Sequence, residues 1–269
     1  MGKTVTQGTD HHDRAVTLPA DGLVALQQDV QQVCLATAPP STALARLGDE
    51  RIWLLYREMV RRRLYGELKN ALKRTCAEAG EALFSDAFAQ HLAEDPPHDR
   101  RFYGIVGCFA KTAIAHFAQT EAAAPHLADL ARFEATRWEV SDLDGRLDSS
   151  ISVGELNFDG RPILSPALRV LSLRHAVHFK PRDGAYRSGR FFLAVHRASD
   201  ELPVRQWTLN RSTYELIRDL QANPDHTLTE AVQAVSRKLQ VVVDEPFLDG
   251  LCTVLSDFVE RRILLGSCT

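Results

Sequence analysis

A carboxylate interrupts the apolar face of the segment PHLADLARFEATRWEV, which spans residues 125–140. Apolar side chains recur there at the three- and four-residue spacing of an α-helix, so the segment is predicted to be helical. Glu134 falls within this stripe, which otherwise consists of Leu127, Leu130, Ala131 and Trp138. An unpaired buried carboxylate is costly, so we expect Glu134 to have a partner or to reach water.

Arg57, in the segment LLYREMV, is the partner that the sequence suggests for Glu134. A guanidinium presents a fork of donors that fits a carboxylate. We therefore predict an Arg57–Glu134 pair with a structural role, joining two helices. The alternative is that Glu134 is a catalytic acid, but the sequence around it lacks the constellation of groups that such an acid needs.

Motifs of catalysis and of cofactor binding are absent from the sequence. It contains no GxSxG, HExxH, GxGxxG or Walker loop. The cysteines are scattered without CxxC spacing, which argues against a zinc site and for a reduced compartment; they are Cys34, Cys76, Cys108, Cys252 and Cys268. The sequence thus predicts no catalytic residue, no metal site and no cofactor in this chain.

Length and composition indicate a globular protein of more than one domain. The chain has 269 residues and a net charge of −3, so no overall basic field indicates nucleic acid as a partner. No apolar run is long enough to span a bilayer, and the first residues lack the apolar core of a signal peptide. We expect a cytoplasmic protein without a membrane partner.

The N-terminal half is predicted to be a helical bundle. Residues 1–18 are polar and are expected to form a disordered tail, followed by helices through residue 145. Residues 49–95 contain no proline, and four apolar residues there are spaced by four, as in a buried helical seam: Val60, Leu64, Leu68 and Leu72.

The C-terminal half, residues 146–269, changes to strands followed by three helices. Segments 190–198 and 203–210 read as a pair of strands joined by a turn. Two of the helices open with apparent capping boxes, Ser212 with Glu215 and Thr227 with Glu230. This order is that of a winged-helix-like domain, so the fold class is predicted to be α+β.

A basic stretch runs from residue 169 to residue 197 within this domain. Only one acidic residue, Asp183, accompanies seven basic ones: Arg169, Arg174, Lys180, Arg182, Arg187, Arg190 and Arg197. The stretch is either an ordinary solvated surface or a contact for an acidic peptide, an acidic protein or phosphates. His175 and His178 also lie here, but three residues apart on a strand they would point to opposite faces, which is poor spacing for one metal.

Three short motifs in residues 50–140 resemble a bacterial family that has been described as DNA-binding. They are YR at 56–57, PP at 96–97 and PHLADLARFE at 125–134. That family includes the partner subunit of the methanobactin-forming oxidase and a subunit of the 3-thiaglutamate pathway. The resemblance implies a subunit that docks onto a barrel-fold enzyme with several iron ions, and that helps it to modify a ribosomally made peptide.

Residues 190–265 resemble, by the order of their elements, the PqqD-like element that recognises precursor peptides. In that fold a leader peptide adds as a strand and lies against the third helix, which implies a site over 203–209 and 247–261. Alternation puts Val204, Gln206 and Thr208 on one face of the strand. The candidate peptide-binding residues are Val204, Arg205, Gln206, Trp207, Leu209, Leu251, Leu255 and Phe258.

The sequence therefore predicts a non-catalytic partner subunit in the modification of a cysteine of a ribosomal peptide. The helical bundle would dock the iron oxygenase, which alone would hold the iron, and the C-terminal domain would bind the leader. The alternative is a DNA-binding transcriptional regulator. The negative net charge argues against it. So do three acidic residues of the last helix, Asp249, Asp257 and Glu260, because recognition helices usually carry Arg or Lys.

Overall fold

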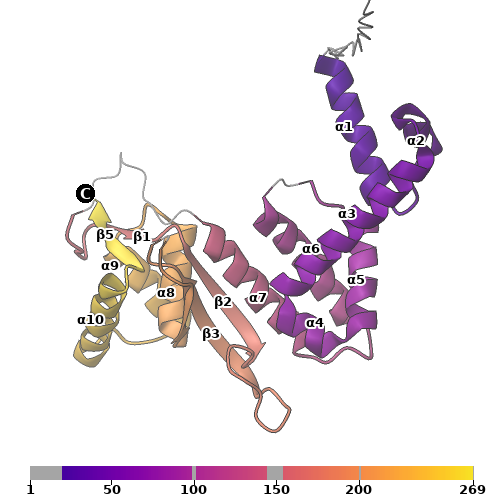
Figure 1. The fold of residues 1–269 in the computed structure, drawn as a ribbon. Coiled ribbons are helices and arrows are strands. Elements are labelled where there is room, and N and C mark those ends of the chain that lie inside the picture. Colours follow the sequence, from indigo (N-terminus) through magenta and orange to yellow (C-terminus); the bar gives the residue numbers. More distant parts are fainter. Residues whose placement is uncertain (1–19, 99–100, 144–153, 200, 269) are drawn as a thin grey trace, which may run out of the picture. The chain divides into compact units, whose positions relative to one another are not determined.

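The computed structural model describes residues 20–98, 101–143, 154–199 and 201–268 (Figure 1). The expected tail at 1–18 and the expected domain boundary at 145 lie outside the described residues. The α+β order is confirmed: helices come first, then strands and three further helices. The chain divides into two compact units, residues 1–63 and residues 64–269, and each is described by itself.

Over its described residues, 20–63, the first unit has three helical segments around a small core. Helices α1 (Ala20–Leu35) and α2 (Ser41–Leu47) precede α3 (Glu50–Ala71), whose N-terminal half belongs to this unit. The core consists of Val33, Ala43 and Leu44, with Leu47 and Trp53 packed against it. The indole N–H of Trp53 donates to the carbonyl of Leu47, which fastens α3 to the end of α2.

The proline-free segment 49–95 is broken into three helices rather than continuing as one seam. Helix α3 ends at Ala71, α4 spans Lys73–Ala79 and α5 spans Glu81–Glu94. The first break is at Leu72, whose φ of −109° and ψ of 47° leave the helical region. The second is at Gly80, whose φ of +79° suits glycine at a helix end. Of the predicted seam, Leu68 and Leu72 are fully buried, whereas Val60 and Leu64 are only partly buried.

Helices α6 (Phe102–Gln119) and α7 (Leu127–Asp142) follow. Helices α4 to α7 are called the helical part of the second unit below. Phe109 of α6 packs edge-on against Phe84 of α5, with ring centroids 5.2 Å apart. The predicted stripe of α7 is buried at Leu127, Leu130, Ala131 and Glu134, whereas Trp138 is 37% exposed. Helix α7 thus faces the core of the helical part and also contacts β2 and β3.

A three-stranded antiparallel sheet follows, in the order β2-β3-β4. The strands are β2 (Leu168–His175), β3 (Ser188–His196) and β4 (Arg205–Leu209), which confirms the predicted strand pair. A short separate pair joins β1 (Arg161–Leu164) to β5 (Leu264–Cys268). Gly160 precedes β1, and a Cβ there would lie 2.7 Å from that of Ser267, so this close approach requires glycine.

Both faces of the sheet are covered by helices (Figure 1). Helix α7 covers one face, where Leu130 and Phe133 pack against Leu193 and Val195 of β3. The other face bears α8 (Arg211–Ala222), α9 (Leu228–Leu239) and α10 (Glu245–Glu260). Strand β3 is central and buried on both faces, which explains why its sequence FFLAV is continuously apolar.

Helix caps were predicted correctly in one of two cases. Thr227 and Glu230 form the expected capping box of α9. The cap of α8 is instead Asn210, whose side chain accepts from the backbone N–H of Thr213, and so Ser212 lies inside the helix. Asn is as good a cap as Ser, so the helix begins two residues before the predicted cap.

Candidate functional site

Strand β4 is an edge of the three-stranded sheet, because β3 pairs with it on one side only. On an edge strand, alternate residues direct their N–H and C=O groups away from the neighbouring strand. Within the ranges that the structure describes, no other strand pairs with this outer side of β4. An extended peptide could therefore add there by backbone hydrogen bonds.

The two faces of β4 alternate as predicted. Val204, just before the strand, packs with the cluster under α7, and Gln206 accepts a hydrogen bond from Arg137 of α7. Trp207 and Leu209 pack with the cluster under α8–α10. Of the predicted peptide-binding residues, those of the strand thus divide between the two layers. A peptide added to the edge could meet either face, and the α10 side offers a cavity.

That cavity lies where β4 begins and α10 ends, and its volume is 330 Å³. The guanidinium of Arg261 lies over the indole of Trp207, 3.9 Å from the ring centroid, and also binds the carboxylate of Asp257 at 2.8 Å. Arg205 projects from the strand into the same lining. The lining also includes His196, Leu202, Pro203, Glu260 and Arg262. We call this the β4–α10 crevice.

Two polar atoms beneath the β4–α10 crevice lack a partner among the described residues: Nε2 of His196 and Nε1 of Trp207. His196 is only 3% exposed. Burial lowers the pKa of His196, with a smaller opposing effect from a backbone hydrogen bond to Arg262. The imidazole is therefore kept neutral, so the positive charge of the crevice comes from arginines.

The three candidate residues of α10 lie in the core rather than in the crevice. Leu251, Leu255 and Phe258 are all at most 9% exposed and belong to the cluster that joins α8, α9 and α10 to the sheet. The helix turns these apolar side chains toward the sheet, as the helical period requires, and presents its end to the crevice. The crevice residues Arg261 and Arg262 were not singled out from the sequence, and Glu260 was noted only as an acidic residue that argues against DNA binding, although the charged run after the apolar stripe marks all three.

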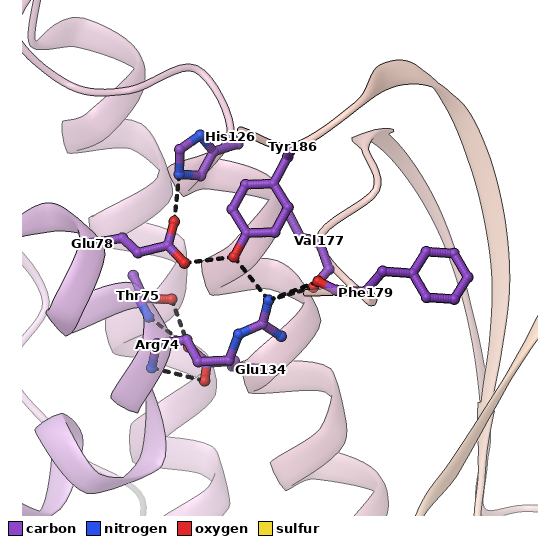
Figure 2. Close-up of polar contacts among 8 residues, drawn as sticks. All are labelled: Arg74, Thr75, Glu78, His126, Glu134, Val177, Phe179 and Tyr186. Carbon is purple, nitrogen blue, oxygen red and sulfur yellow. Dashed lines mark hydrogen bonds and ion pairs between the residues drawn. The ribbon is translucent and has the colours of Figure 1, made fainter. Parts of the chain in front are cut away.

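Glu134 is satisfied by the N-terminus of α4, not by Arg57 (Figure 2). Its carboxylate accepts from the backbone N–H of Arg74 at 3.1 Å and of Thr75 at 2.8 Å, and from the Thr75 hydroxyl at 2.8 Å. The free N–H groups of a helix start are natural donors to a carboxylate. Arg57 instead donates to the carbonyls of Val33 and Thr37 in the first unit. The prediction of an Arg57–Glu134 pair is therefore wrong.

Arg74 links the start of α4 to the loop between β2 and β3 (Figure 2). Its Nη2 donates to the carbonyl of Val177 at 2.7 Å and to the hydroxyl of Tyr186 at 3.0 Å. Tyr186 in turn donates to Glu78, which also binds Nε2 of His126 at 2.6 Å. Burial raises the pKa of Tyr186, and its bond to Glu78 acts in the same direction. This network fixes the loop on the helical part, and no sequence pattern indicated it.

The histidines of the basic stretch have separate roles. Nδ1 of His175 lies 2.9 Å from Oδ2 of Asp129, which also accepts from the backbone N–H of Arg174. His178 is buried beside Phe179 and Phe191, and both of its ring nitrogens lack a partner among the described residues. Over the described ranges, no group of three His, Cys, Asp or Glu is placed to hold a metal ion.

The basic stretch does not form one continuous surface. Arg169 is paired with Glu139 at 2.7 Å, and Arg197 donates to the carbonyl of Leu143, so both are tied to the end of α7. Arg174 and Arg190 line a separate cavity of 730 Å³ beside α6 and α7. The other three basic residues, Lys180, Arg182 and Arg187, together line a cavity of 570 Å³ in the loop between β2 and β3. The seven basic residues are therefore divided among different neighbours.

A family model described as the HvfC C-terminal domain matches residues 165–259. The matched segment begins just before β2 and ends one residue before the end of α10, so it contains the sheet and the three helices that cover it. No curated protein matches the chain. Among the described residues, no helix is long and apolar enough to cross a membrane.

Proposed function

We propose that this chain is a non-catalytic partner subunit that binds the leader of a ribosomal precursor peptide for an iron-dependent oxygenase. The observation that carries the proposal is the open edge of β4 beside the β4–α10 crevice. The similarity of residues 165–259 to the HvfC C-terminal domain supports a partner role for this part of the chain. The resemblance of residues 50–140 to partner subunits of oxygenases supports it independently.

The leader binds as an added strand, and backbone hydrogen bonds to the outer side of β4 set its register. Side chains that alternate along the leader then point toward α7 or toward the crevice. The crevice lining contains three arginines and one glutamate: Arg205, Arg261, Arg262 and Glu260. Because the positive charges outnumber the negative one, an acidic leader side chain is favoured there over a basic one.

Cysteine oxidation itself belongs to the partner enzyme, which holds the iron. The described residues of this chain offer no group of His, Cys, Asp or Glu that fits a metal. The contribution of this chain is effective concentration: holding the leader keeps the reacting cysteine near the enzyme at a concentration far above that of free peptide. Docking of the enzyme is assigned to the helical part within residues 50–140.

The proposal expects genes for a barrel-fold enzyme and for a short cysteine-containing peptide beside the gene for this chain, and the test is reconstitution of the chain with these two products. Addition of the chain should lower the peptide concentration needed for half-maximal conversion. Arg205→Glu should raise that concentration about tenfold, a loss of about 1.4 kcal/mol, without loss of enzyme co-purification. Arg237→Glu, on the exposed surface of α9, is the matched charge reversal outside the crevice and should have no effect.

Conversion that is equally efficient without this chain would contradict the proposal. Equal effects of Arg205→Glu and Arg237→Glu would also contradict it, because the overall charge of the chain, rather than contacts in the β4–α10 crevice, would then explain the weaker binding. Absence of both genes from the neighbourhood would favour the regulator alternative.

A further inference from the structure

A cavity lies at the other edge of the three-stranded sheet, where β2 and β3 meet α6 and α7. Its volume of 730 Å³ is within the usual range of ligand sites. The side formed by α6 and the start of α7 is largely apolar and includes Ile114, Phe117 and Pro125. Three arginines line the same cavity: Arg132, Arg174 and Arg190. We call it the β2–α7 cavity.

Arg174 of β2 and Arg190 of β3 place like charges on neighbouring strands. Both lie next to the Leu173–Phe191 pair of the ladder, on the same side of that pair. Both are exposed, and neither guanidinium has a hydrogen-bond or ion-pair partner among the described residues. Like charges opposite each other on two strands are destabilising. The two arginines therefore cost stability unless an anion binds between them.

The carboxylate in the lining does not neutralise these two arginines. Asp129 is only 5% exposed, and both of its oxygens already accept hydrogen bonds. Oδ1 accepts from Nη1 of Arg132 at 3.3 Å, and Oδ2 accepts from the backbone N–H of Arg174 at 2.8 Å. The second oxygen also lies 2.9 Å from Nδ1 of His175. Three arginines thus face one carboxylate that is already engaged, which leaves an excess of positive charge in the cavity.

The shape and the charge of the cavity together define the class of ligand. Guanidinium groups bind oxyanions through paired N–H donors, and two of them match a doubly charged group such as a phosphate ester or a dicarboxylate. The cavity extends down to buried side chains, because Leu173 is 1% exposed and Phe117 is 4% exposed. A small molecule reaches such a floor, whereas the surface of a folded protein or of duplex DNA does not.

We propose that the β2–α7 cavity binds a small molecule whose doubly charged oxyanion group lies between Arg174 and Arg190, with an apolar part against α6. The inference goes beyond the proposed function and does not rest on it, because the leader is assigned to β4, at the opposite edge of the sheet. The α6 and α7 side of the cavity belongs to residues 50–140, the region assigned to enzyme docking. The test therefore measures docking separately from anion binding.

The experiment is calorimetric titration of the full chain, at neutral pH and constant ionic strength, with phenyl phosphate and with benzylmalonate. Each carries a doubly charged head on one aromatic ring, so the tighter binder shows whether the site prefers phosphate or carboxylates. Benzyl alcohol, which lacks the charge, should not bind measurably. Arg174→Gln and Arg190→Gln should each weaken binding about tenfold. Arg237→Gln removes the same charge from the exposed surface of α9 and should leave binding unchanged.

Urea unfolding separates ligand binding from a structural role of the two arginines. Without ligand, Arg174→Gln and Arg190→Gln should be at least as stable as the wild type, because each removes the repulsion between the strands. With saturating ligand the order should reverse, since the ligand stabilises the form that binds it more tightly. A purely structural role would instead make both variants less stable under both conditions.

Absence of binding by both charged ligands at millimolar concentration would overturn the proposal. So would equal losses of affinity in Arg190→Gln and Arg237→Gln, because the net charge of the chain would then account for binding. Variants at Arg174 and Arg190 that bind the ligands normally but no longer co-purify with the barrel-fold enzyme would also overturn it, and would assign the arginines to the docking surface.

Discussion

Glu134 of α7 caps the first turn of α4 by accepting both the backbone N–H and the hydroxyl of Thr75, each at 2.8 Å. The carboxylate is only 9% exposed, so these donors replace the water that it would otherwise bind. A residue that looked misplaced in an apolar stripe is thus what holds the break between α3 and α4 in place.

Glu134→Ala should destabilise the protein by about 3 kcal/mol, because it leaves buried N–H groups at the start of α4 without an acceptor. Glu134→Gln keeps one acceptor oxygen and should cost about half as much. Urea unfolding measures both. Arg57→Ala combined with Glu134→Ala should give additive losses, since the two side chains have different partners. A coupling above about 1 kcal/mol would restore the pair that the sequence suggested.

Three buried histidines should make stability fall in acid. Burial lowers the pKa of His91, His178 and His196. In the unfolded chain they titrate near about 6.5. Below that pH the unfolded state binds more protons than the folded state, so the free energy of unfolding should decrease as pH falls from about 6.5 toward the folded pKa values.

Urea unfolding at pH values on either side of neutral measures this slope. His196→Gln should make it shallower, because it removes one of the three buried histidines. A stability that stays flat or rises on acidification below about pH 6.5 would contradict this account.

The isolated chain should contain no stoichiometric iron, because the described residues provide no cluster of ligands for it. Metal analysis of protein purified without its partner is the measurement, and protein expressed with the partner enzyme is the comparison. Near-stoichiometric iron in the folded, isolated chain would assign the metal site to this subunit after all.

Binding to DNA should be weak and should disappear as salt is raised. Arg169 and Arg197 are engaged at the end of α7, and the exposed side of α10 carries Asp249 and Asp257. A gel shift with random DNA and with the DNA upstream of the gene tests this at physiological salt. Nanomolar, sequence-specific binding would support the transcriptional regulator instead.

The order of elements could be predicted from the sequence because it depends on local patterns. Alternation in 203–210, the capping box at Thr227 and the stripe of α7 all express contacts within a few residues. The partner of Glu134 could not be predicted, because the break at Leu72 has neither proline nor glycine to mark it. The free N–H groups that bind the carboxylate exist only because of that break.

The candidate site was predicted in part for the same reason. Strand β4 and its alternation follow from the sequence, whereas its position at the sheet edge is a property of the topology. The helical period identified Leu251, Leu255 and Phe258 as one face of α10, but the period of an amphipathic helix marks its buried side first. The residues that face the crevice come from the end of the helix, where no period applies.

Calorimetric titration of the full chain with a synthetic leader peptide tests the central claim most directly. Gln206→Pro removes a backbone donor within β4 and disturbs the edge on which the leader would pair. It should abolish measurable leader binding while the variant remains folded and still co-purifies with the enzyme. Leader affinity that is unchanged in a folded Gln206→Pro variant would contradict the account and place the peptide site elsewhere.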